Sequence, residues 1–497
     1  MLNDLQLEFL DVAKPSITSD QVINPQGYKG LYGFHKYWGK KPMETYGFLI
    51  EKLTDKNEIV CDPFLGSGVA ALESYTRNRR FLGCDLNPVA VGLSRLLVSP
   101  PDKKELQQAV NYIENRVKKE IEESYKIANG DSVGSHYLWK GYNLISVWQK
   151  VSGGRKKIES EPSEADRKLI DSYKGYKCHR LGTGKFFNNS RINSLAKMTI
   201  YDLFTSRALR NIELILNAID DCDRDIQDAL RFCLTAASGQ MSNMVFAISN
   251  RGKAQGEKSD RIEVGSWVIG YWRPEVHFEI NVWNCFESRA RKFFKALSSF
   301  SGSQKTVRFS NADEVLSGAG KLAIEQDDAN NFLSNMPDNS IHSLITDPPH
   351  SDRIPYLELS ELWNVIIGQN VNFEKEIVVS NAKDRGKTKE QYFVAMSRFV
   401  VEVGRTLVPG GVFALMFNAR DNDSWKFYDI IEKSSELKFQ GHFEVAYSAN
   451  SVVQDNRKGS LQDYVLIFQK PAAGSNDFVR LRILKDLPNW KSECPRK

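Results

Sequence analysis

The sequence predicts a doubly wound α/β sheet of parallel strands, split by a long and mostly helical insert. Two apolar segments, Glu58–Cys61 and Ile341–Thr346, read as buried strands, and each leads into an aspartate followed by proline. A glycine turn and helix-compatible residues follow the first segment. We therefore expect one sheet built from residues 1–100 and 311–470, an insert at 101–310 and a polar tail at 471–497.

Composition indicates a soluble protein of two or three domains in a reducing compartment. The chain has 497 residues, 41% hydrophobic and 26% charged, with a formal net charge of +5. Its seven cysteines form no Cys-x-x-Cys pair, so we expect neither a metal site nor a disulfide framework. The N-terminal residues lack the basic and apolar blocks of a signal peptide and no apolar run is long enough for a bilayer, so we expect a cytoplasmic protein.

The first strand leads into a predicted ligand loop. Gly66 and Gly68 follow Asp62-Pro63 and permit close approach of a ligand to the backbone. The next strand, Arg80–Cys84, is followed by Asp85, at the position where doubly wound sheets place an acid that binds ribose hydroxyls. A dinucleotide fingerprint usually has a third glycine where this chain has Ala71, so S-adenosylmethionine, which has no pyrophosphate, fits the pattern better.

Three segments of this half resemble the amino-group DNA methyltransferases. Asp62–Gly68 (DPFLGSG) and Gly83–Pro88 (GCDLNP) are similar to the cofactor motifs of that family, and His35–Pro42 (HKYWGKKP) is similar to the segment that packs over the methionine end of the cofactor. The resemblance implies a Rossmann-like methyltransferase fold, with Asp62 facing the methionine amino group and Asp85 facing the ribose. It implies further cofactor-site residues, with the first two near the entrance: His35, Lys41, Pro63, Phe64, Gly66, Gly68 and Leu86. A surface loop with an aromatic anchor stays open for residues 35–42.

The C-terminal half resembles the same family from its adenine-binding acid to its catalytic loop. By that resemblance Asp328 accepts a hydrogen bond from the cofactor adenine, with Ala329 beside it, and Asp328 also suits a helix N-cap. The catalytic loop is Asp347-Pro348-Pro349-His350. A surface turn is the alternative reading of an isolated Asp-Pro-Pro.

The composition of this loop has a chemical reason. An exocyclic amine on a base is a poor nucleophile, because its lone pair is delocalised into the ring. A carboxylate and a backbone carbonyl that each accept one N–H direct this lone pair toward a methyl donor. Consecutive prolines fix such a carbonyl. The family usually has Tyr, Phe or Trp after Pro-Pro to stack on a flipped base, and this chain has His350, whose flat ring stacks more weakly.

The remaining segments fit the same plan. Residues 391–407 have helical spacing, Val412–Phe417 reads as a buried strand, and a last strand pair is expected at Gly441–Tyr447 and Asp463–Gln469.

Residues 150–210 hold fourteen Lys or Arg against six Asp or Glu. Aromatic residues are interleaved there: Tyr173, Tyr176, Phe186 and Phe187. This pattern suits phosphate contact and base stacking, and equally a solvated surface loop.

The function expected from these features is methyl transfer from S-adenosylmethionine to adenine N6 in double-stranded DNA, with the insert as the target-recognition region. Adenine is favoured because Asp rather than Ser precedes Pro-Pro. Methylation of cytosine N4, methylation of an RNA base, and a non-catalytic DNA-binding protein on the same scaffold stay open. The chain shows no nuclease signature, so restriction would need a separate partner; phage defence and an orphan role are alternatives.

Overall fold

The structure is a computed structural model of the chain. It describes residues 16–23, 25, 27–127, 132–150, 157–249, 262–298, 307–351, 354–417, 422–446, 462–472, 481 and 484–495. The predicted strand end at Tyr447 and residues 151–156 of the basic stretch lie outside these ranges.

Seven strands form the main sheet: β1 (Ile59–Asp62), β2 (Arg80–Cys84), β9 (Leu322–Glu325), β10 (Ile341–Thr346), β11 (Leu407–Phe417), β12 (Lys438–Ala446) and β13 (Gln462–Gln469). Their order across the sheet is β12-β13-β11-β10-β1-β2-β9. The five strands from β11 to β9 are parallel, and β13 runs antiparallel to both neighbours. The order in which the chain adds strands reverses between β1 and β10: β2 and β9 lie on one side, and β11 lies on the other. Open α/β sheets bind their ligands at such a switch point.

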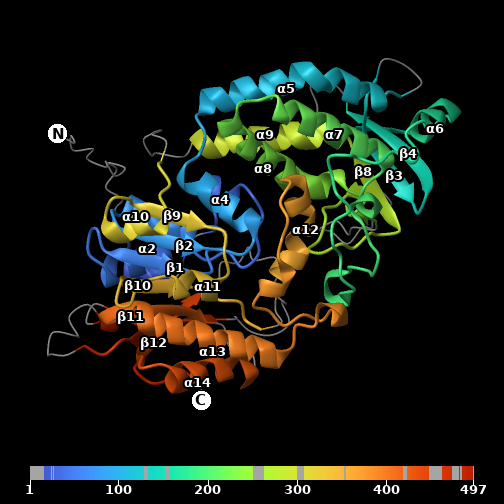
Figure 1. The fold of residues 1–497 in the computed structure, drawn as a ribbon. Helices are drawn as coiled ribbons and strands as arrows, with labels where there is room; N and C mark the ends of the chain where they lie inside the picture. The colour runs from blue at the N-terminus through green and yellow to red at the C-terminus, as the bar shows by residue number, and fades with distance from the viewer. Residues whose placement is uncertain are drawn as a thin grey trace.

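Helices cover both faces of this sheet (Figure 1). One face carries α2 (Met43–Leu53), α3 (Val69–Thr76) and α4 (Pro88–Val98); the other carries α10 (Ala312–Ser317), α11 (Ala329–Ser334), α13 (Lys389–Thr406) and α14 (Asn422–Ser434). Side chains alternate along each strand, so Val60 packs in the first core while Ile59 and Cys61 pack in the second. The predicted doubly wound Rossmann-like sheet is confirmed.

The turn between β1 and α3 depends on two glycines. Gly66 has φ +54° and Gly68 has φ +81°, a region that side chains with a Cβ rarely adopt. A Cβ on Gly68 would lie 2.5 Å from the Oγ atom of Ser94 in α4. The Leu65 amide donates to the carbonyl of Cys84, which holds the turn against the end of β2.

The insert combines helices with a second sheet. Its helices are α5 (Lys103–Ser124), α6 (Glu164–Asp171), α7 (Ser206–Asp220), α8 (Arg224–Met241) and α9 (Val282–Ser298). Its strands are β3 (Gly134–Lys140), β4 (Asn143–Lys150), β5 (Lys157–Ser160) and β8 (Val276–Ile280), paired antiparallel in the order β5-β4-β3-β8, and the pair β6 (Ala247–Ile248) and β7 (Glu263–Val264). The insert was expected to be mostly helical, and this sheet was not expected. Five consecutive residues of β3 are buried, so the strand has no alternating pattern.

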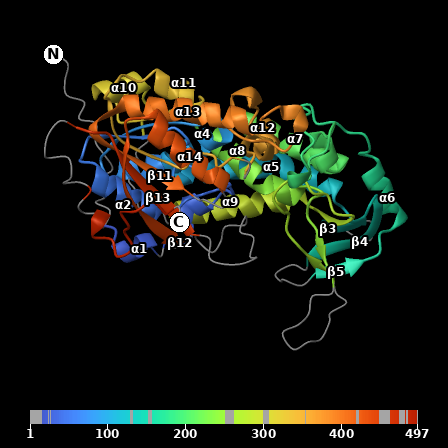
Figure 2. The same cartoon turned by 90° about the horizontal axis from the view of Figure 1, so that it is seen from below.

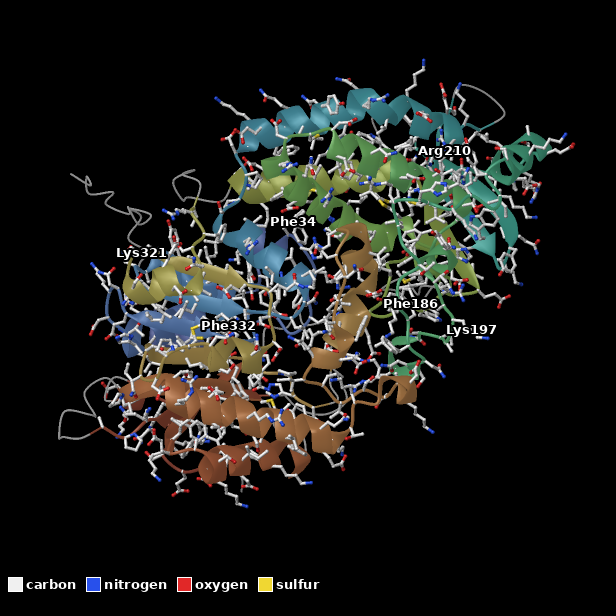
Figure 3. The ribbon with its side chains drawn as sticks, in the orientation of Figure 1. Phe34, Phe186, Lys197, Arg210, Lys321 and Phe332 are labelled. Atoms are coloured by element: carbon white, nitrogen blue, oxygen red, sulfur yellow. The ribbon has the colours of Figure 1, made fainter. Side chains whose placement is uncertain are left out.

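The insert packs directly on the sheet lobe. Helix α12 (Tyr356–Ile366) lies between the two parts in both views (Figures 1 and 2). Phe34 stacks on Phe293 of α9 with ring centroids 4.4 Å apart, and Trp38 stacks on Trp363 of α12 at 4.6 Å. Figure 3 shows Phe34 at this junction. The short elements are α1 (Ser19–Ile23), η1 (Gly30–Gly33), η2 (Ser190–Ile192), η3 (Ile200–Leu203), η4 (Phe373–Lys375) and η5 (Lys383–Arg385).

The C-terminal segment differs from the expected polar tail. In its described part, Leu484 and Leu487 are buried, and Lys491 exchanges two backbone hydrogen bonds with His442 of β12. Trp490 packs so close to Gly441 that a Cβ there would lie 2.3 Å from its ring. The segment is too short and too rich in charge to reveal this packing by periodicity.

Candidate active site

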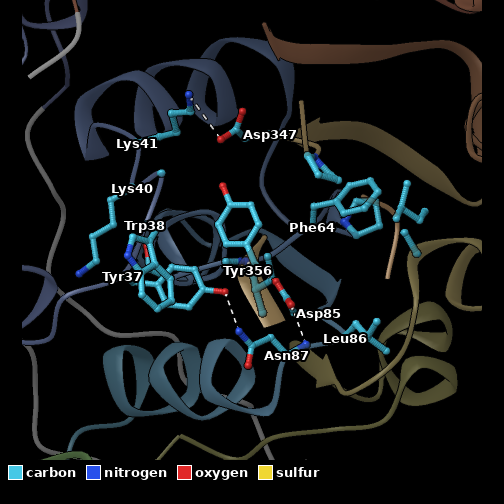
Figure 4. Close-up of a pocket in the computed structure, with 18 of the residues that line it drawn as sticks. Tyr37, Trp38, Lys40, Lys41, Phe64, Asp85, Leu86, Asn87, Asp347 and Tyr356 are labelled. Atoms are coloured by element: carbon cyan, nitrogen blue, oxygen red, sulfur yellow. Dashed lines mark hydrogen bonds and ion pairs between the residues drawn. The ribbon is translucent and has the colours of Figure 1, made fainter. Parts of the chain in front are cut away.

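A pocket lies at the carboxyl ends of β1, β2 and β10 (Figure 4). It holds about 830 Å³ of empty space, part of it open to solvent. Residues that lie far apart in the sequence meet in its wall, including ten of the expected site residues: Lys41, Pro63, Phe64, Gly66, Asp85, Leu86, Asp328, Ala329, Asp347 and Pro349. His35, Asp62, Gly68, Pro348 and His350 are outside the wall.

Asp85 is fixed at the end of β2 by two backbone amides. Its carboxylate accepts from Gly66 N at 2.8 Å and from Asn87 N at 2.9 Å. Burial raises the pKa of Asp85 to about 6; the two amides lower it, and the charge of Glu376 raises it further. The amides hold the carboxylate in a fixed orientation toward the pocket, where it can accept hydrogen bonds from hydroxyl groups.

Asp62 and Gly68 support the loop from behind the pocket wall. Asp62 is 1% exposed, and its Oδ1 accepts from the Thr346 hydroxyl at 2.5 Å and from Phe64 N at 3.2 Å. Burial raises the pKa of Asp62 to about 7, against the lowering effect of those two hydrogen bonds. The bond to Thr346 joins the end of β1 to the end of β10.

His35 lies away from the expected cofactor entrance. It is 3% exposed, its Nε2 lies 3.0 Å from the Thr235 hydroxyl of α8, and its ring contacts Trp363 edge-on. Burial lowers the pKa of His35 to about 3, so the ring is neutral at physiological pH. This histidine joins the N-terminal segment to the insert.

The far end of the pocket contains Asp328 and Ala329. Asp328 caps α11, since its Oδ1 accepts from Asn331 N at 3.0 Å. Its other oxygen lies 3.2 Å from Lys375 Nζ. Phe64, Leu86 and Ile377 give this pocket apolar surface suited to a planar ring.

The Asp347 carboxylate lies at the edge of the pocket, and each of its two oxygens contacts a basic side chain. His350 Nε2 lies 3.1 Å from Oδ1, and Lys41 Nζ lies 3.4 Å from Oδ2. Burial would raise the pKa of Asp347, but the charge of Lys41 and the contact with His350 hold it below the ordinary value of 3.8. Tyr392 donates to the Pro349 carbonyl at 2.7 Å and so fixes the loop.

Several wall residues have no counterpart among the expected site residues: Tyr32, Tyr37, Lys40, Asn87, Tyr356, Lys375 and Glu376. Asn87 donates to the hydroxyls of Tyr37 at 3.2 Å and Ser360 at 2.8 Å (Figure 4 shows the first bond). Tyr37, Lys40 and Asn87 lie inside the segments that resemble the family, so the sequence offered a signal for them. Lys375 and Glu376 come from a loop without any motif.

The aromatic residues of the basic stretch are largely internal. Phe187 is buried against Phe373, Phe186 packs edge-on against Tyr271, and the Tyr176 hydroxyl bonds Glu213. Several basic residues of the same stretch are exposed: Lys168, Lys174, Lys177, Arg180, Arg191 and Lys197. Two basic residues of the stretch still lie over its rings: the exposed Lys185 over Phe187, 5.1 Å from the centroid, and Arg210 over Tyr173 at 5.5 Å.

The structure also bears on membrane-spanning helices, metal sites and disulfides. Within the described residues, no helix combines the length and apolar character that crossing a membrane requires. Nor do the described residues gather three or more His, Cys, Asp or Glu into a group that could hold a metal ion. All seven cysteines are free thiols.

Comparisons with known proteins relate the N-terminal part to DNA methylases. Residues 13–95 match a family model described as a DNA methylase of the N6/N4 type. A type II methyltransferase of Methanocaldococcus jannaschii, M.MjaII, is 22% identical over 208 residues, which make up 41% of this chain and 38% of that protein. The match therefore spans well under two thirds of the relative's length.

Two solved structures show weaker likeness. A putative DNA modification methylase of Thermus thermophilus, TTHA0409, solved with S-adenosyl-L-methionine, is 18% identical, with a TM-score of 0.20 over 32% of this chain and 60% of its own. An S-adenosylmethionine-dependent methyltransferase of Methanosarcina mazei is 14% identical, with a TM-score of 0.17 over 37% of this chain and 77% of its own. Likenesses of this size carry no argument, so the strand order and the pocket define the class: a Rossmann-like α/β fold of the methyltransferase type.

Proposed function

We propose that this chain is an S-adenosylmethionine-dependent DNA methyltransferase that modifies an exocyclic amino group, with adenine N6 as the favoured target. One observation carries the proposal: the same pocket brings together the glycine loop after β1, the acid after β2 and Asp347 after β10. The N-terminal match to a DNA methylase model supports the same reading.

The residues present fit the cofactor. Asp85 is oriented to accept from ribose hydroxyls, and Asp328 and the apolar surface of Phe64 and Leu86 suit the adenine ring. Gly66 and Ser67 of the glycine loop line the pocket after β1, where the methionine part would lie. When bound, the cofactor supplies a methyl group activated by a sulfonium centre.

Asp347 accepts one N–H of the target amino group, and the backbone carbonyl of Pro348 accepts the other. Both acceptors draw the nitrogen lone pair out of conjugation and toward the methyl donor. Asp347 is held ionised by its neighbours, so it is available as an acceptor at physiological pH. The His350 ring beside it offers a flat surface for an extruded base.

The proposed substrate is double-stranded DNA, and the insert is the proposed recognition region. Its exposed lysines and arginines, of which Figure 3 labels Lys197, suit contacts with phosphates. A base must leave the duplex to reach Asp347, because its carboxylate lies at the pocket edge and its side chain is only 14% exposed. A cytoplasmic location fits the free thiols.

The test is incubation of the chain with methyl-labelled cofactor and mixed-sequence genomic DNA, followed by nucleoside mass spectrometry. We expect N6-methyladenine. N4-methylcytosine would keep the reaction class and change the base, and label found only on RNA would move the proposal to RNA. Cofactor binding without any transfer would leave a non-catalytic DNA-binding scaffold.

The first prediction concerns Asp347. Asp347→Asn keeps the shape of the side chain but removes a negative acceptor, so we expect transfer to fall by about 10²–10⁴-fold with cofactor affinity nearly unchanged in calorimetry. The matched control is Asp338→Asn, in the turn before β10, where the exposed carboxylate pairs with Arg405. Full turnover by Asp347→Asn would contradict the mechanism.

A further inference from the structure

Lys41 lies in the pocket wall beside the catalytic loop. Its backbone is fixed just before α2, because the Tyr32 hydroxyl donates to its carbonyl at 2.8 Å and Pro42 caps the helix. Its side chain is only 8% exposed. From this position its ammonium points to the catalytic loop (Figure 4).

The ammonium bridges two carboxylates from distant parts of the sheet. Lys41 Nζ lies 2.9 Å from Asp463 Oδ2 on β13 and 3.4 Å from Asp347 Oδ2 after β10. The side chains of Asp463 and Asp347 are 7% and 14% exposed. Buried charges of this kind need a partner at close range, and removing one partner leaves an uncompensated charge.

The groups that face Asp347 come from several parts of the structure. Lys41 and, behind it, Asp463 lie on one side, and His350 lies on the other. Asp62 of β1 and Tyr46 of α2 also interact with it electrostatically. The Lys41 charge has the largest lowering effect on the pKa of Asp347; the hydrogen bond and the charge of His350 lower it less, and Asp62 repels the carboxylate.

We propose that Lys41 is a positioning residue of the methyl transfer: anchored on Asp463, its ammonium fixes the orientation and the negative charge of Asp347 as acceptor of the target amino group. This inference rests on the proposed function. An ionised carboxylate has about four lone-pair sites, so Asp347 retains acceptor capacity for an amino N–H while Lys41 and His350 each occupy one site. Without Lys41, burial and Asp62 would favour the protonated acid, which cannot serve as this acceptor.

The experiment is the pH profile of kcat at saturating cofactor and DNA. Saturation keeps the ionisation of Asp85, which affects cofactor binding, out of the profile. The unaltered chain is expected to show no acid limb from Asp347 across the range in which it stays folded. Lys41→Met is expected to gain an acid limb, because loss of the ammonium raises the pKa of Asp347 by about one to three units above its value in the unaltered chain.

Matched variants separate charge from packing. Asp463→Asn breaks the same bridge but leaves the positive charge beside Asp347, so it lowers kcat equally at all pH values and adds no limb. Lys41→Arg keeps the charge and the original profile. If Lys41→Met folds poorly, the double variant Lys41→Met with Asp463→Asn takes its place, because it leaves fewer unpaired buried charges. We expect this double variant to retain the new limb.

Two controls identify the group that titrates. Lys36→Met makes the same substitution in the same segment, where the ammonium lies over the Trp267 ring, and leaves the profile unchanged. His350→Phe in the Lys41→Met background shows whether the imidazole causes the limb, and we expect the limb to persist. An unchanged profile in both variants that lack Lys41, or an identical limb in Asp463→Asn, overturns the inference while the proposed function stands. No transfer by the unaltered chain overturns both.

Discussion

Three aspartates at neighbouring strand ends are held in different charge states by their surroundings. Burial raises the pKa of Asp62 to about 7 and that of Asp85 to about 6, whereas the positive neighbours of Asp347 lower its pKa. Asp62 and Asp85 therefore bind a proton more tightly in the folded chain than in the unfolded chain. Their ionisation therefore reduces stability as the pH rises from 3.8 to about 7.

The second prediction follows from Asp85. The ionised carboxylate is the better acceptor for hydroxyls, so cofactor affinity is expected to increase as the pH rises through the pKa of about 6 and to level off above it. Asp85→Asn is expected to weaken binding at alkaline pH by about 1.5–3 kcal/mol and to flatten this dependence. Isothermal calorimetry at several pH values measures both effects.

Two other groups at the pocket, Asp62 and the wall residue Lys40, each have a pKa of about 7, so a slope that remains in Asp85→Asn around neutral pH is assigned to these two. A cofactor affinity that Asp85→Asn leaves unchanged at every pH would remove this residue from the ribose site.

At the scale of single elements, the insert is organised around one buried ion pair. Arg207 of α7 and Glu279 of β8 are each 1% exposed and are joined by bonds of 2.9 Å. The guanidinium lies between the rings of Tyr125 and Tyr137, 4.3 and 4.1 Å from their centroids, and donates to the carbonyl of Ser124 at the end of α5. Helix α7, helix α5 and the second sheet therefore meet at this arginine.

The third prediction concerns that pair. Glu279→Gln leaves the Arg207 guanidinium buried without a countercharge, so we expect a loss of about 3–5 kcal/mol in the free energy of unfolding. Glu287→Gln is the matched control, because its partner Arg291 is 73% exposed and the pair is worth less than about 1 kcal/mol. Urea denaturation of both variants measures the difference, and equal losses would contradict the assignment.

At the scale of the whole molecule, β1, the middle one of the five parallel strands, has neighbours from both halves of the chain. It pairs with β2 on one side and with β10, from beyond the insert, on the other. The insert also packs into the core on one face of the sheet, as Phe232 of α8 does against Gly92 of α4. Sheet and insert therefore share one continuous core, which favours cooperative unfolding.

The fourth prediction is a single calorimetric transition that the cofactor moves as a whole. At a concentration about 100 times its Kd, a ligand that binds only the folded chain stabilises it by about 2.7 kcal/mol. Asp85→Asn should show a smaller shift at the same concentration. Two transitions, of which the cofactor moved only one, would show that the insert folds independently of the sheet.

The sequence by itself determined the strands that carry the chemistry. The segments around β1, β2 and β10 are short apolar runs that end in an aspartate or are followed by one, and such signals lie within a few residues of one another. The same local signals located the glycine turn, the cap at Asp328 and the helix at 389–406. The sheet of the insert was missed, because a run of consecutive buried residues, such as the first five of β3, lacks the alternation that distinguishes strand from helix.

Only the tertiary structure decided which charges meet. Lys41 and Asp463 are 422 residues apart, and Asp62 and Thr346 are 284 apart, yet both pairs are in contact. Glu376 enters the pocket from a loop with no motif, and His35 leaves it for Thr235 of the insert. Local patterns specify where strands and turns form, whereas the partners of a buried charge depend on how those elements pack, because desolvation and Coulomb attraction act through space and not along the chain.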